Sequence, residues 1–90
     1  MTTLYVRHLV LDYAQWRRAF DDHALTRQRY GITVRRVQHA VGNPLEIIVT
    51  LEADDLARAR EFVDSDDLRT AMIRAGVNSR PEIWWAEEIT

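Results

Sequence analysis

Residues 4–31 read LYVRHLVLDYAQWRRAFDDHALTRQRYG, and they contain the signals of a strand, a helix start and a helix stop in succession. Residues 4–11 are apolar at nearly every position, which is typical of a strand covered on both faces. Asp12 is suited to cap a helix, because its carboxylate can accept from the free amides of the next turn. Gly31 suits a helix end, since glycine readily takes the left-handed conformation found there. The stretch predicts one strand followed by one helix.

The faces of these two elements follow from their spacing. Alternate strand residues point the same way, so Leu4, Val6, His8 and Val10 share one face. We expect this face to meet the helices. The helix presents one stripe at helical spacing, and this stripe should face the sheet. Its members are Tyr13, Trp16, Phe20, His23, Ala24 and Arg27.

The rest of the chain adds three more strands and two helical segments. Strands are predicted over 32–41, 45–52 and 82–89, with a turn at Gly42-Asn43-Pro44. Asp54-Asp55 opens a second helix, Ser65 caps a short third helix, and Gly76 stops it. The order β-α-β-β-α-β predicts a single domain over 1–90 of the α+β class. This ferredoxin-like fold has a four-stranded antiparallel sheet with helices on one face.

The uncovered sheet face is predicted to be unusually apolar. It would expose Tyr5, Leu9, Leu11, Ile48 and Trp84. A monomer rarely leaves a large contiguous apolar patch in water. Packing two such sheets face to face would bury it, so we expect a homodimer.

The composition excludes several classes of chemistry and partner. Fourteen acidic residues against twelve basic ones give a net charge of −2, which disfavours nucleic acid as a partner. The chain has no cysteine and no lysine, which excludes thiolate catalysis, disulfides and Schiff-base chemistry. No segment approaches the roughly 20 apolar residues that span a bilayer, and no leader pattern opens the chain. We therefore expect no membrane association and a cytoplasmic location.

A longer set of residues resembles a known family. The set comprises Val10-Leu11-Asp12-Tyr13, Trp16, Phe20, His23, Arg27, Gly31, Asn43-Pro44, Glu52-Ala53-Asp54-Asp55-Leu56, Phe62, Ser65, Leu68, Ala71-Met72, Ala75-Gly76-Val77 and Pro81-Glu82. It resembles the dimeric α+β-barrel superfamily, and within it the short antibiotic-biosynthesis-monooxygenase-like proteins, many of them labelled cyclases. The resemblance implies a dimeric barrel. It does not imply one reaction, because the superfamily mixes cofactor-independent oxygenases, polyketide cyclases, isomerases and haem-degrading enzymes.

Two departures from the family bear on the reaction. Quinone-forming monooxygenases use a tryptophan in the second helical region, where this chain has Phe62. Haem-degrading members use an asparagine on the first strand and a helical histidine. This first strand has no asparagine, and no histidine lies between Asp54 and Gly76. These departures argue that this chain uses neither the mechanism of the quinone-forming monooxygenases nor that of the haem-degrading members.

His23 and His8 are the predicted catalytic residues. Both should point into the space between helices and sheet, where two imidazoles can act as general acid and base near neutral pH. In the alternative interpretation each is a buried histidine satisfied by a backbone carbonyl or by water.

Trp16, Phe20, Arg27 and Trp85 are the predicted substrate-binding residues. Aromatic walls suit a flat ligand, and a guanidinium can pair with an anionic or enolate oxygen. Alternatively, the aromatic residues fill the core, and Arg27 reaches solvent or a surface carboxylate. No metal site is predicted, because His8, His23 and His39 lack the close spacing of ligand motifs.

These residues favour a small-molecule enzyme without a bound cofactor. It would act on an aromatic or polyketide-like substrate in a helix–sheet pocket. Cyclisation or isomerisation fits better than oxygenation, because proton transfer needs only positioned bases. The alternative is a non-catalytic dimer that binds a small ligand or stabilises a partner.

Overall fold

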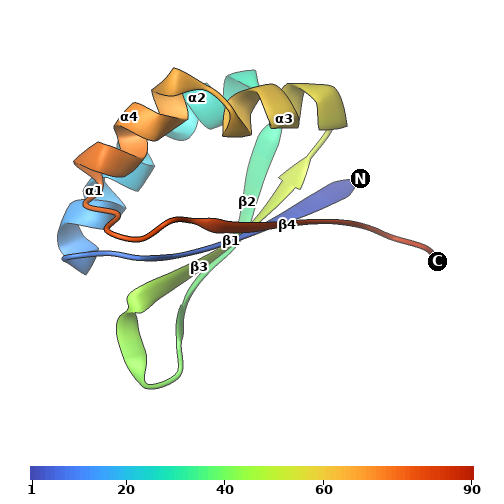
Figure 1. The fold of residues 1–90 in the computed structure, drawn as a ribbon. Helices are drawn as coiled ribbons and strands as arrows, with labels where there is room; N and C mark the ends of the chain where they lie inside the picture. Colours follow the sequence, from blue (N-terminus) through green and yellow to red (C-terminus); the bar gives the residue numbers. More distant parts are fainter.

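The computed structural model describes residues 1–90, and it contains one four-stranded antiparallel sheet with all helices on one side (Figure 1). The elements in chain order are β1 (Thr2–Leu9), α1 (Tyr13–Asp22), α2 (Ala24–Arg29), β2 (Ile32–Ala40), β3 (Asn43–Ala53), α3 (Leu56–Val63), α4 (Asp66–Arg74) and β4 (Glu82–Glu87). The strand order is β2-β3-β1-β4. This arrangement confirms the predicted ferredoxin-like α+β fold.

Side-chain caps begin three of the helices at the places that the sequence indicates. The carboxylate of Asp12 accepts from the amide of Gln15 at 3.0 Å, and that of Asp55 accepts from the amide of Arg58 at 3.2 Å. The hydroxyl of Ser65 accepts from the amide of Leu68 at 3.1 Å. Each cap satisfies an amide that has no partner inside its own helix, which fixes where that helix begins.

The first helix is not continuous, contrary to the prediction. His23 ends α1 and precedes α2, with φ −91° and ψ 6°. A ψ near −42° would continue the α-helix, so the axis changes direction at this residue. The amide of His23 donates to the carbonyl of Phe20 at 3.2 Å, which is the tighter i→i−3 bond of a helix end.

The other differences concern element ends. Ala40 pairs with Asn43, so the β2–β3 turn consists of Val41 and Gly42 rather than 42–44. The side chain of Asn43 accepts from the amide of Leu45 at 3.1 Å, where the ladder register shifts. β1 ends at Leu9 instead of residue 11, and β4 ends at Glu87 instead of residue 89.

The core lies between the sheet and the helices, and the predicted strand faces are confirmed. Leu4, Val6, His8 and Val10 are all buried on the helix side of β1 and its extension. The alternating residues Ile47, Val49 and Leu51 of β3 are buried beside them. The facing helices contribute Trp16, Ala59, Phe62 and Ala75.

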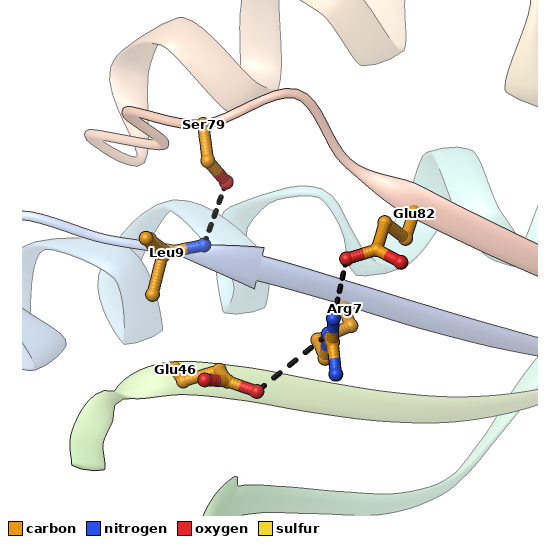
Figure 2. A network of polar contacts seen from close by, with 5 residues as sticks. All are labelled: Arg7, Leu9, Glu46, Ser79 and Glu82. Atoms are coloured by element: carbon orange, nitrogen blue, oxygen red, sulfur yellow. Dashed lines mark hydrogen bonds and ion pairs between the residues drawn. The ribbon is translucent and has the colours of Figure 1, made fainter.

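The opposite face of the sheet is open, and Arg7 lies in its middle (Figure 2). Its guanidinium pairs with Glu82 on β4 and lies 3.6 Å from Glu46 on β3. Near the end of β1, the hydroxyl of Ser79 accepts from the amide of Leu9 at 2.9 Å. These contacts tie β1 to both of its neighbours and pair Arg7 with two carboxylates on this face.

None of the helices is long and apolar enough to cross a membrane.

Candidate functional site

A cavity of about 70 Å³ lies between the helices and the sheet. Eighteen residues line it, and fifteen of them are hydrophobic. The three polar ones are His8, His23 and Arg27, and no carboxylate lines the cavity. The volume is several times the roughly 10–15 Å³ that one water molecule requires, but it is below the roughly 300 Å³ of a typical ligand pocket.

The structure brings five of the six predicted site residues to this one cavity. They are His8, Trp16, Phe20, His23 and Arg27. Trp85 does not line it, although it packs against the core from β4, as its predicted face requires. Its ring lies instead 5.9 Å from the guanidinium carbon of Arg60 on α3.

His8 projects from β1 into the apolar core and is 6% exposed. Its ring lies edge-on to Trp16, with 6.0 Å between the centroids. Neither ring nitrogen has a hydrogen-bond partner in the protein. Burial lowers the pKa of His8 to about 4, so the imidazole is neutral at pH 7. A neutral ring offers one N–H donor and one free acceptor nitrogen.

His23 projects from the break between α1 and α2. Its ring stacks on Phe62 of α3, with 5.7 Å between the centroids. Its buried Nε2 also has no protein partner. Burial lowers the pKa of His23, and the charge of Arg27 lowers it further, whereas Asp67 acts in the opposite direction. The break in the helix thus holds a neutral imidazole at the cavity wall.

Arg27 is largely buried, at 7% exposed, and it pairs with no carboxylate, although none of its nitrogens is both buried and without a partner. Its guanidinium carbon lies 3.8 Å from the ring centroid of Phe20, and one Nη donates to the carbonyl of Phe20 at 2.8 Å. Burial lowers its pKa, but an arginine keeps its charge in proteins. The alternative of a pairing with a surface carboxylate is therefore wrong, whereas contact of the guanidinium with solvent remains.

A polar groove of about 250 Å³ lies outside this cavity, between α1 and α4. Ala19, His23 and Ala71 line both the groove and the cavity. Gln15 spans the groove, since its amide donates to the carbonyl of Arg74 at 3.0 Å. His23 thus lies where the inner cavity meets the outer groove.

Sequence reasoning missed the far wall of the cavity. Phe62 contacts both His23 and Tyr30, whose ring centroid lies 5.4 Å away. Leu68 and Met72 of α4 complete this wall. The sequence shows only that Phe62, Leu68 and Met72 belong to the apolar stripes of α3 and α4. An apolar stripe does not show whether its residues line a cavity or pack in a solid core.

His39 lies apart from this site. It is exposed on β2, and its Nδ1 lies 3.0 Å from the carbonyl of Ala40. No three histidine or carboxylate side chains gather as they would around a metal ion.

No protein-family model matches the sequence, and no curated protein matches it either. Solved structures do match the fold. A proposed antibiotic biosynthesis monooxygenase from Bordetella bronchiseptica superimposes with a TM-score of 0.81 at 11% identity, over 99% of this chain and 97% of that one. A second, from Caulobacter crescentus, gives 0.74 at 14% identity over 99% and 90%.

A designed protein, Foldit4, also matches, with a TM-score of 0.67 at 19% identity over 97% of both chains. Identities this low show the fold alone, and a fold hosts many activities. The chain thus shares the fold of the antibiotic-biosynthesis-monooxygenase-like proteins, the group that its sequence resembles.

Proposed function

We propose that the cavity binds a compact, largely apolar ligand and that His23, assisted by His8, moves protons on it without a bound cofactor. The observation that carries this proposal is the set of three buried ring nitrogens, two on His8 and one on His23, that no protein atom satisfies. Buried polar groups are nearly always hydrogen-bonded. A ligand with oxygen atoms would supply the missing partners.

The chemistry follows from the charge states of the two rings. A neutral His23 has a free nitrogen that can take a proton from a carbon next to a carbonyl group. The imidazolium so formed returns the proton to another atom of the same ligand, while an N–H of His8 donates to the ligand oxygen. Such a sequence needs no oxidant, so isomerisation or cyclisation fits better than oxygenation.

The size of the cavity bears on the substrate. A volume of about 70 Å³ is about half of the roughly 150 Å³ of a cavity that binds benzene, so it holds a short chain or part of a ring and excludes a whole polycyclic polyketide. A longer polyketide-like molecule would place only its reacting end in the cavity, with the remainder along the groove between α1 and α4. Trp16 and Phe20, whose rings stack with centroids 4.7 Å apart, would form the aromatic wall.

A non-catalytic ligand-binding protein is the second candidate. The small cavity favours it, because a binding module needs only a filled pocket and no room for a reaction path. Both candidates include a homodimer, supported by the exposed side chains of Tyr5, Leu9, Leu11 and Trp84 on the open sheet face.

Proton abstraction can be tested without knowing the physiological substrate. Phenylacetone is a compact aromatic ketone, and exchange of its α-protons for deuterium is visible by NMR in D₂O. We expect the protein to accelerate this exchange and His23→Gln to remove roughly 100- to 10,000-fold of the acceleration, with little change in melting temperature.

His39→Gln is the matched control, because His39 lies outside the cavity, and it should exchange at the wild-type rate. Unchanged exchange in His23→Gln would remove His23 as the base. Binding of phenylacetone without exchange would favour the non-catalytic candidate.

A further inference from the structure

The cavity carries a positive charge that the protein does not balance. Arg27 is the only charged residue among those that line it. Asp21 favours the charged form of Arg27 from a distance, but its carboxylate already pairs with Arg17 at 3.2 Å. Arg17 itself opposes the charge of Arg27. A buried charge without a partner is costly, so such a group is normally paired.

The guanidinium makes only one hydrogen bond to the protein, and its other N–H groups are not buried, so they are available to a ligand. It has five N–H donors, and the one bond it makes is to the carbonyl of Phe20. The Phe20 ring covers one of its faces, which fixes the plane of the fork. A planar donor held in this way matches a carboxylate, which accepts two parallel bonds from a guanidinium.

We infer that the ligand is a compact apolar carboxylate whose negative group pairs with Arg27 while its apolar part fills the cavity beside His8 and His23; this inference rests on the proposed function. The apolar part is required by the fifteen hydrophobic lining residues. The carboxylate is required by the unbalanced guanidinium. Arg27 is then the residue that determines specificity for an acid over a neutral analogue.

Binding of an anion would also change the proton affinity of His23. The charge of Arg27 disfavours imidazolium at present, and Asp67 is the acid that opposes it. A carboxylate beside Arg27 offsets that charge and adds a negative one, which raises the pKa of His23. A base with a higher pKa takes a proton from carbon more readily, so binding of the anion would assist the proposed proton transfer.

The test compares phenylacetate with phenylacetamide, which has nearly the same shape and no charge, by calorimetric titration of the full chain. We expect phenylacetate to bind at least ten-fold more tightly than phenylacetamide. Arg27→Gln should bring the two affinities to within about two-fold. Arg29→Gln is the matched control, because Arg29 is exposed on the same helix, and it should keep the preference.

The possible outcomes test the role of Arg27 separately from the proposed function of the cavity. Equal affinities in the wild-type chain, or a preference that survives in Arg27→Gln, would overturn the role of Arg27 while leaving the cavity as a binding site. Failure of phenylacetate, phenylacetamide and phenylacetone alike to bind would overturn the proposed function as well. If Arg27→Gln does not fold, the wild-type comparison alone decides, and Arg27→Lys tests the need for a fork-shaped donor.

Discussion

His8 lies at a strand position flanked by the buried Val6 and Val10, where an apolar side chain would satisfy every packing requirement. An unsatisfied buried polar group costs about 1–3 kcal/mol. Where neither water nor a ligand pairs with its ring nitrogens, the histidine contributes less to stability than leucine would. Such a cost is characteristic of a residue retained for what it binds.

Replacing His8 by leucine tests this cost. Leucine fills a similar volume and removes both unpaired nitrogens, so we expect the free energy of unfolding at pH 7 to rise by about 1 kcal/mol. Binding of phenylacetone should weaken, because the donor to its oxygen is lost. Chemical denaturation and NMR titration measure the two effects. A large loss of stability would contradict the interpretation and assign His8 a structural role.

The pH dependence of the free energy of unfolding provides a second test of the buried, neutral state of His8. The pKa of His8 falls from its ordinary value of 6.5 to about 4 on folding, so between these values the unfolded chain binds more protons. Stability is then unaffected by this group above pH 6.5 and decreases as the pH falls toward 4, by up to about 1.4 kcal/mol per unit. The lowered pKa of His23 acts in the same direction. His8→Leu should flatten the profile between pH 7 and 5.

At the scale of elements, the strand faces could be predicted because alternation has a period of two and leaves little choice of register. The caps at Asp12 and Ser65 could be predicted because each has a local chemical cause. The break at His23 could not, since the apolar stripe continues through it from Phe20 to Arg27 and nothing in the local sequence stops a helix there.

Part of the candidate site could also be predicted from the regular spacing of side chains on a strand or a helix. His8, His23, Trp16 and Phe20 follow from the faces of β1 and α1, and the structure brings them to one cavity. Burial of Arg27 depends on the packing of α2 against the ring of Phe20, a tertiary contact that helical spacing does not contain. Trp85 has the predicted face, but its ring lies beside Arg60 of α3 and does not line the cavity.

Gly76 ends α4 with φ +75°, and a Cβ there would lie 3.2 Å from the side chain of Gln15. Gly76→Ala should therefore combine backbone strain of about 1–2 kcal/mol with loss of the Gln15 bond to α4. Gly42 has φ +85° and open space around it, so Gly42→Ala should show the strain alone.

Thermal and chemical denaturation of both variants isolates the contribution of Gln15. We expect Gly76→Ala to be the less stable by about 1 kcal/mol. Equal losses would mean that Gln15 moves aside without cost and does not hold α1 to α4.

At the scale of the whole molecule, the helices cover one face of the sheet and leave the other open (Figure 1). Leu11 and Trp84 are 64% and 48% exposed on the open side. The one strongly charged group in its middle, Arg7, is already paired with Glu46 and Glu82 (Figure 2). Burial of this face against a second copy would leave Arg7 paired, although its cluster with two carboxylates keeps a net charge of −1.

Sedimentation velocity tests this association directly. We expect a dimer at micromolar concentration and a melting temperature that rises with protein concentration, as mass action requires. Only monomer under these conditions would exclude the homodimer.

Ile48→Glu then locates the interface. Ile48 is half-buried on the open face, so a glutamate there can stay in contact with water in the monomer and the fold should tolerate it. In the dimer the same carboxylate would be buried against apolar side chains, which is unfavourable, so the dissociation constant should rise at least ten-fold. Leu25→Glu is the matched control, because Leu25 is exposed on α2, on the helical side, and the dimer should persist. If Leu25→Glu dissociates the dimer and Ile48→Glu does not, two copies associate through their helices, and the open sheet face must have another partner.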